Sequence, residues 1–172
     1  RRPPRSTLSS SSAASDVYKR QQPPLPEHLK GTKVEEPIEP VIPDYPDALA
    51  LQFALNNGPV LPHFLNGNSD HPVNLWRWTS SDNKVLEWNA TGVKNWKLQD
   101  DLSQAVTIQS SYQFGRYSLV LKRKLRGSQK KLDIQFQAGK SIPIAFNIWD
   151  GYQGETKTKK SISSWFELKL AK

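Results

Sequence analysis

The stretch "IPIAFNIW" (residues 142–149) alternates between two kinds of side chain. One phase is large and apolar: Ile142, Ile144, Phe146 and Ile148. The other is small and mixed: Pro143, Ala145, Asn147 and Trp149. Because successive side chains of a strand point to opposite faces, the stretch predicts a strand with one apolar face and a second face suited to lining a pocket.

Six other segments alternate in the same way and are separated by clusters of Gly, Asn, Asp and Pro. They are residues 48–55, 73–78, 105–114, 117–125, 132–139 and 164–171. Short alternating segments with turn residues between them are typical of antiparallel β-sandwiches. We therefore predict an all-β, antiparallel sandwich of immunoglobulin-like or carbohydrate-binding-module-like architecture over residues 47–172.

The first 46 residues differ in composition from the rest. Residues 1–22 are rich in Ser and Arg without any periodicity, and "SSSAASDVYKRQ" resembles a translated cloning adapter, so we expect a disordered, non-native tail. Residues 23–46 hold seven of the thirteen prolines and are predicted to form an extended linker or loop.

Composition excludes several classes of site and partner. The 172 residues contain no Cys, which excludes disulfides, thiolate zinc sites, iron–sulfur ligation and covalent haem attachment. No apolar run is long enough for a membrane span. Half of the net charge of +8 lies in residues 1–30, with six Lys/Arg and two Asp/Glu, so a nucleic-acid partner is not predicted.

The segment "YSLVLKRKL" (117–125) places a cation in the apolar phase. Tyr117, Leu119 and Leu121 lead in phase to Arg123. A buried guanidinium requires a carboxylate of the fold or an anionic ligand as its partner, unless Arg123 lies at the rim of the sheet and reaches water.

Seven pieces in order resemble the haem-binding gamma subunits of the ethylbenzene dehydrogenase and dimethylsulfide dehydrogenase type. They are "DALALQF" (47–53), "PHFLNGN" (62–68), "PVNLWRW" (72–78), "NATG" (89–92), "YSLVLKRKL" (117–125), "IPIAFNIWDG" (142–151) and "KSISSWFELKL" (160–170). The resemblance implies a β-sandwich holding one b-type haem, which transfers electrons without catalysing a reaction itself. It also implies a periplasmic location, with a molybdopterin catalytic subunit, an iron–sulfur subunit and a soluble cytochrome as partners. The family has strands before the first matching piece, which we expect to be missing here.

The same resemblance implies the ligands of the haem iron. Lys160, with Lys159 as the register alternative, matches the ligating lysine of the family. Asn66 stands where the family has its ligating methionine, and Leu65 precedes it. A thioether is a soft iron ligand and an amide is a poor one, so only half of the expected ligand pair is kept.

Two histidines and two tryptophans are further candidates for the haem site. His63, and likewise His71, is an alternative second ligand, because imidazole binds iron well. Trp76 and Trp78 share one face of their predicted strand, where the resemblance implies a pocket wall. Trp88 and Trp96 are predicted to lie in irregular segments.

Two functions remain open on the sequence. The first is an electron-transfer haem domain, with Lys160, Asn66, Arg123, Trp76 and Trp78 at the cofactor. The second is a haem-less sandwich serving as a binding or scaffolding module, with carbohydrate as one candidate ligand. Catalysis by this chain alone is not predicted, since the sequence has no nucleophile elbow, zinc-binding His-Glu motif, phosphate loop or dinucleotide fingerprint.

Overall fold

The computed structural model describes residues 45–56 and 58–172. The predictions for the tail at residues 1–22 and for the linker up to residue 44 lie outside the described residues. Within the described ranges there is no α-helix, and hence none that could cross a membrane.

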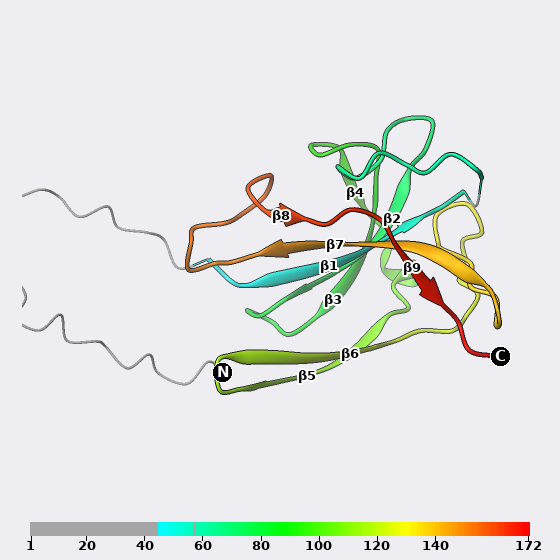
Figure 1. Ribbon diagram of the computed structural model, residues 1–172. Helices are drawn as coiled ribbons and strands as arrows, with labels where there is room; N and C mark the ends of the chain where they lie inside the picture. The colour runs from blue at the N-terminus through cyan, green and yellow to red at the C-terminus, as the bar shows by residue number, and fades with distance from the viewer. Residues whose placement is uncertain (1–44, 57) are drawn as a thin grey trace, which may run out of the picture. The chain divides into compact units, whose positions relative to one another are not determined.

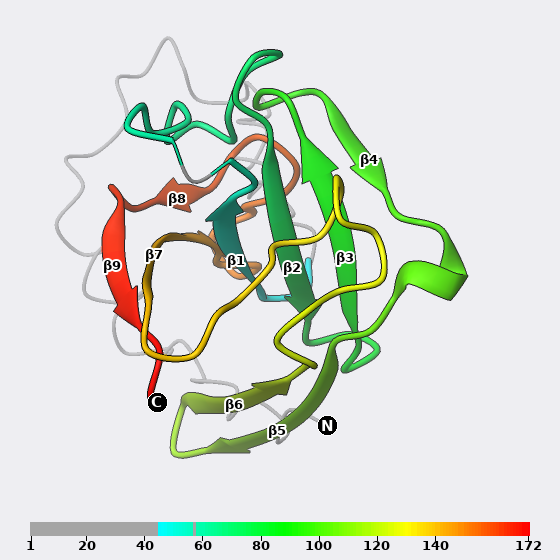
Figure 2. The same cartoon turned by 90° about the vertical axis from the view of Figure 1, so that its right-hand side faces the viewer.

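The described residues form nine strands: β1 (Ala48–Ala54), β2 (Val73–Thr79), β3 (Val85–Ala90), β4 (Trp96–Leu98), β5 (Thr107–Gln113), β6 (Arg116–Lys122), β7 (Ser141–Trp149), β8 (Ser161–Ile162) and β9 (Phe166–Lys169). Seven of them make one sheet in the order β4-β3-β2-β1-β7-β8, with β9 also paired to β7. β5 and β6 form a separate hairpin beneath it (Figures 1 and 2). Every pairing is antiparallel, which confirms the predicted fold class.

The register of β1, β2 and β7 gives the large sheet two unlike faces. Directly opposed residues share a face, and Leu51 pairs with both Trp76 and Phe146. On the other side, Ala50 pairs with both Arg77 and Asn147. We call the first the hairpin face, because β5 and β6 cover part of it, and the second the alanine face.

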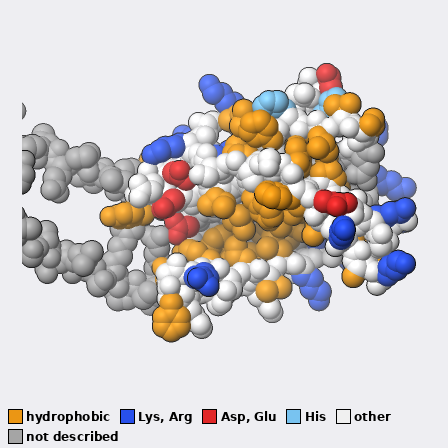
Figure 3. Space-filling model, viewed as in Figure 1, with side chains coloured by type: hydrophobic (Ala, Val, Ile, Leu, Met, Phe, Trp, Pro, Cys, Tyr) orange, Lys and Arg blue, Asp and Glu red, His pale blue; other side chains and the backbone are white. Residues whose placement is uncertain are grey.

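The main hydrophobic core lies on the hairpin face. Its buried members are Phe53, Trp76, Val85, Val106, Ile134, Phe136, Ile142 and Ile144, with Ile108 of β5 and Leu121 of β6 packed against them. Hydrophobic side chains also gather at the surface between β7 and the hairpin (Figure 3). Ile148 of β7 and Phe166 of β9 are both exposed, and the ring centroid of Phe166 lies 6.0 Å from that of Phe146.

Arg123 follows β6 and is buried on the hairpin face, as the phase of its segment predicted. Its side chain and that of Glu87 are each only 1% exposed, and Nη1 lies 3.1 Å from Glu87 Oε2. Nη2 donates to the carbonyl of Ile134, and the guanidinium lies 4.8 Å from the centroid of Trp76. Of the alternatives left open by the sequence, the structure therefore shows a carboxylate of the fold as the partner.

The predicted strand at residues 132–139 is wrong, although Ile134 and Phe136 are buried. Leu132 is exposed and Asp133 is buried, opposite to the predicted alternation. The backbone of this segment bonds to side chains and to loop carbonyls rather than to a strand partner, and the Phe136 amide donates to the Leu125 carbonyl at 2.7 Å. Asn89 Nδ2 donates to the Leu132 carbonyl at 2.6 Å, and the Ile134 amide donates to Asn74 Oδ1 at 3.4 Å.

The strands β3, β4 and β8 were not predicted, and the assignment of Trp88 and Trp96 to irregular segments is wrong. Trp88 lies in β3 and Trp96 begins β4. The alternation of apolar side chains along β3 is interrupted at position 87. A glutamate, the partner of Arg123, lies there on the buried hairpin face. β4 and β8 have only three and two residues, too few to show a period.

Asp150 and Gly151 make the turn after β7. Asp150 Oδ1 accepts hydrogen bonds from the amides of Tyr152 and Gln153, as in an Asx turn. Gly151 does not have a positive φ. Glycine is needed there because a Cβ would lie 1.7 Å from the carbonyl oxygen of Tyr45.

The buried pair of Glu87 and Arg123 should dominate local stability. Arg123→Met should lower the free energy of unfolding by about 3–5 kcal/mol, because it leaves a carboxylate buried without its cation. The double variant Glu87→Gln/Arg123→Met should lose less than the two single variants added together. Urea unfolding measures this, with the exposed Lys122→Met as the control. Equal, small losses for Arg123→Met and Lys122→Met would contradict the importance of the pair.

Candidate functional site

Lys160 is carried to the alanine face by the loop that leaves β7. The loop folds back through local bonds, including Glu155 N to Asp150 O at 3.0 Å and Lys159 N to Thr156 O at 2.9 Å. The chain then pairs with β7 again, with Ser161 opposite Ile148. Lys160 is thereby held immediately before β8, half-buried.

Asn66 comes from the loop between β1 and β2 and is fully buried. Its φ is 68°, a left-handed conformation that asparagine tolerates better than most residues. Gly67 follows at φ 73°, where a Cβ would lie 2.5 Å from the carbonyl oxygen of His71. The tight loop that positions Asn66 therefore depends on both the asparagine and the glycine.

The structure brings Lys160 and Asn66 together, although they are 94 residues apart. Lys160 Nζ donates to Asn66 Oδ1 at 2.7 Å. Asn66 Nδ2 in turn donates to Gln52 Oε1 at 2.5 Å and to Asn147 Oδ1 at 2.9 Å. The only charged group in this polar network is the Lys160 amine, because the other three side chains are neutral amides.

Two indoles lie beside the amine. Lys160 Nζ lies 4.2 Å from the ring centroid of Trp96 and 4.8 Å from that of Trp149. Burial and, as a smaller cause, the nearby positive charge of Arg77 together lower the pKa of Lys160 from 10.5 to about 7. Near neutral pH a large fraction of Lys160 is therefore the neutral amine, the form able to ligate a metal.

A haem held from both sides does not fit this arrangement. A metal between two donors requires about 4 Å between them, since a metal–nitrogen bond is about 2 Å long. The 2.7 Å between Lys160 Nζ and Asn66 Oδ1 leaves no room for an iron. The donor chemistry agrees, because the Lys160 amine suits iron whereas the Asn66 amide is a poor ligand.

The other predicted site residues lie elsewhere. Trp76 and Trp78 are on the hairpin face, and so is Arg123, across the sheet from Lys160. The structure thus divides the predicted cofactor residues into two groups, one on each face.

The two histidines near Asn66 do not join the polar network. His63 is exposed, stacks on Phe64 at 4.9 Å, and accepts a hydrogen bond from the Leu65 amide through Nδ1 at 3.2 Å. His71 is half-buried, and its amide donates to Asn68 Oδ1 at 2.8 Å. In the described part of the chain, no three His, Cys, Asp or Glu side chains cluster as a metal site would require.

A pocket of about 430 Å³ lies beside Lys160 on the alanine face. We call it the tryptophan pocket. Its walls include three indoles and three cationic side chains: Trp88, Trp96, Trp149, Arg77, Lys94 and Lys157. Trp96 and Trp149 also contact Lys160, so the polar network and the pocket share a wall.

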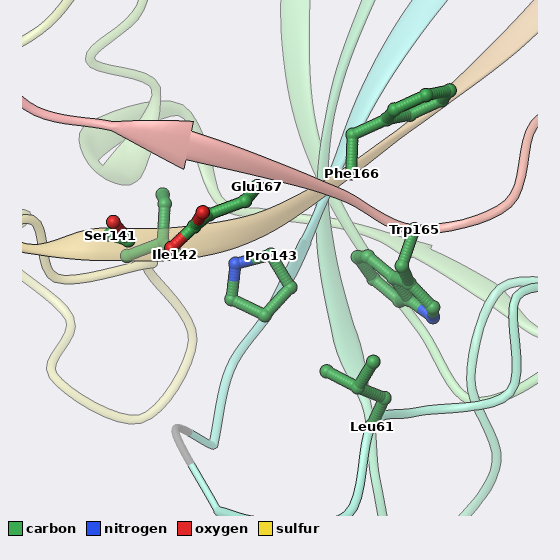
Figure 4. Close-up of a pocket in the computed structure, with 7 residues that line it drawn as sticks. All are labelled: Leu61, Ser141, Ile142, Pro143, Trp165, Phe166 and Glu167. Atoms are coloured by element: carbon green, nitrogen blue, oxygen red, sulfur yellow. The ribbon is translucent and has the colours of Figure 1, made fainter.

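A second hollow, of about 400 Å³, lies where β9 pairs with β7 (Figure 4). Leu61, Pro143, Trp165 and Phe166 give it an apolar lining, and Glu167 is its only charged residue. The Trp165 indole is fixed by donating Nε1 to the Pro62 carbonyl at 2.8 Å. The two hollows therefore carry charges of opposite sign.

The prediction that the second face of residues 142–149 lines a pocket is confirmed for Trp149, which lies in the wall of the tryptophan pocket, whereas Asn147 of the same face belongs to the polar network. Gln52 and Trp96 were missed. Gln52 gave one usable signal, because it is a polar residue in phase with the alanines of "ALALQFA", on a face that is otherwise apolar.

Lys160 should titrate near pH 7. Because its folded-state pKa lies below the unfolded value of 10.5, the unfolded chain binds more protons between about pH 7 and 10.5. The cost of burying Lys160 is therefore fully present below pH 7, and stability rises with pH through that window. NMR of selectively labelled lysine side chains checks this: one resonance should have a midpoint near 7, disappear in Lys160→Met and persist in the exposed control Lys159→Met. No lysine titrating below pH 9 would contradict it.

Comparison with known proteins gives one informative likeness. No family model matches the chain. Over 122 residues, 71% of this chain, it is 30% identical to a Haloferax mediterranei protein that bears the name of a respiratory nitrate reductase haem subunit, ORF7. The match covers 42% of that protein, so this chain spans about two fifths of its relative's length.

Proposed function

We propose that this chain is a haem-binding, electron-transfer domain of an oxidoreductase complex. Two independent likenesses support the proposal: the name of the Haloferax relative and the ordered pieces shared with the gamma subunits of molybdenum enzymes. Because the sequence has no Cys, the haem would be held without covalent attachment, as a b-type haem.

The observation that carries the proposal is the meeting of Lys160 with position 66. The resemblance assigns the two iron ligands to these positions, which are distant in sequence, and their side chains meet at 2.7 Å on the alanine face. A lysine buried among indoles with a pKa of about 7 is costly for a fold unless its neutral amine is used.

Lys160 is the residue that would hold the iron, and the haem would supply one-electron transfer when bound. Asn66 would accept a hydrogen bond rather than ligate. A neutral amine that ligates through its lone pair keeps two N–H donors, so Lys160 would still be able to donate to Asn66 Oδ1 while it held an iron on another side. The proposal is therefore a haem with one protein ligand.

The remaining expectations belong to the same proposal. The domain would work beside a molybdopterin catalytic subunit and an iron–sulfur subunit, pass electrons to a soluble cytochrome, and be located in the periplasm. Trp76, Trp78 and Arg123 would support it through the core of the hairpin face, given where they lie.

Haem reconstitution of the purified chain tests the proposal. Adding haemin should give a Soret band at a stoichiometry of one, and Lys160→Ala should abolish it by removing the amine ligand. Lys159→Ala is the matched control, since Lys159 is exposed and bonds the Gln153 carbonyl instead. An unchanged spectrum in folded Lys160→Ala, or no haem at any stoichiometry in the wild-type chain, would overturn the proposal.

Asn66→Met restores the thioether that the family resemblance leads us to expect. Without haem the variant should lose about 2–4 kcal/mol of unfolding free energy, because Gln52 and Asn147 lose a buried donor and Lys160 an acceptor. With haemin it should bind more tightly than wild type and show a shifted, low-spin spectrum. Chemical unfolding with and without haemin measures both effects. Weaker haem binding than wild type would contradict a ligand position at residue 66.

The haem-less binding module is the second candidate, and one observation favours it. The network of Lys160, Asn66, Gln52 and Asn147 is complete without a cofactor, as expected of a fold that does not reserve the space. A sugar-stacking platform is less well supported. Trp88 and Trp96 meet at 60° with centroids 6.2 Å apart, instead of presenting one flat surface.

A further inference from the structure

Two arginines lie on opposite faces of the large sheet, each against an indole. Arg123 lies over Trp76 and has a buried carboxylate partner in Glu87. Arg77 lies over Trp149, with Cζ 5.2 Å from the ring centroid. No residue of the described ranges forms a hydrogen bond or ion pair with the Arg77 side chain. Arg77 is thus the unpaired counterpart of Arg123.

Burial makes this lack of a partner costly. It lowers the pKa of Arg77, and the charge of Asp82 compensates only in part. A guanidinium has five donors and suits a planar, bidentate acceptor such as a carboxylate. In the tryptophan pocket, which Arg77 lines, nothing in the described lining is acidic.

The rest of the pocket adds positive charge and flat apolar walls. Lys94 and Lys157 line it beside Trp96 and Trp149. Lys157 has a φ of 51° and is held there by its carbonyl, which accepts a hydrogen bond from Trp149 Nε1 at 3.0 Å. Backbone strain of this kind concentrates at binding sites, and here it fixes the loop that lines the pocket.

The volume of about 430 Å³ is in the usual range for small-molecule sites. Indole walls favour a flat, apolar body, and the cations favour a negative charge at one end. A neutral sugar would give Arg77 hydrogen-bond acceptors but no counter-charge, and a large polyanion would not contact the indole walls.

We propose that the tryptophan pocket binds a small organic anion with a flat apolar body, of the aromatic carboxylate class, with its carboxylate on Arg77 and its ring in the corner between the indoles of Trp96 and Trp149, which meet at 79° and so offer the ring one stacking contact and one edge contact. The inference does not rest on the haem proposal, because it uses the contacts of the haem-free chain.

Binding of 2-naphthoate to the full, haem-free chain tests the proposal, followed by tryptophan fluorescence and calorimetry. Naphthoate should bind saturably at one site, and the uncharged isostere 2-naphthamide should bind at least roughly tenfold more weakly, because it lacks the charge-assisted bond to Arg77. Arg77→Gln should weaken naphthoate binding by a similar factor and leave naphthamide binding unchanged.

Arg126→Gln is the matched control. It removes the same charge from an exposed residue outside the pocket lining, and should leave naphthoate binding intact. If Arg77→Gln fails to fold, Lys94→Gln/Lys157→Gln serves instead, since both lysines are exposed and line the pocket. Equal binding of naphthoate and naphthamide, equal losses for the arginine variants, or no saturable site would overturn the proposal. A missing Soret band with intact naphthoate binding would overturn only the haem proposal.

Discussion

The strands β1, β2 and β7 bury side chains on both of their faces, and this constraint shapes the rest of the molecule. A polar side chain on a sheet buried from both sides has little water to bind, so it must find a partner within the fold. The chain satisfies this requirement differently on its two faces. On the hairpin face a full charge is matched by a full charge, Arg123 with Glu87. On the alanine face the Lys160 amine meets only neutral amides and indoles.

This difference determines what each cation can do. The charge of Arg123 is matched within the fold, because its guanidinium donates to the Glu87 carboxylate and to the Ile134 carbonyl. Lys160 has no such counter-charge among its contacts, and the positive charge of Arg77 lies near it, so loss of its proton becomes easy. The first arrangement serves stability. The second leaves a neutral nitrogen donor in a partly buried, aromatic setting, which is what a metal-binding or proton-exchanging site needs.

The alternation of apolar and polar side chains predicted the strands that have two unlike faces. It missed the strands in which apolar and polar side chains share a face. β1, β2 and β7 were located to within a residue or two because alternation reports burial directly. The same criterion failed at Leu132 and Asp133, since Asn89 and Asn74 satisfy the backbone of that segment without a strand partner. The contact of Lys160 with Asn66 spans 94 residues and depends on a left-handed turn, so no local pattern encodes it. Only the family resemblance singled out both positions. It did not predict the side-chain amides of Gln52 and Asn147, which complete the network.

The two proposed sites are electrostatically coupled, because Arg77 and Lys160 lie against the same indole, that of Trp149. The positive charge of Arg77 is one of the causes that lower the pKa of Lys160. An anion on Arg77 would cancel much of that repulsion and raise the pKa of Lys160, so the lysine would hold its proton more tightly near neutral pH. A protonated amine cannot ligate iron, and linkage is reciprocal, so occupation of the tryptophan pocket and ligation by Lys160 should each weaken the other. A domain with both sites would therefore hold its cofactor less tightly while a carboxylate is bound, through two cations that contact one tryptophan.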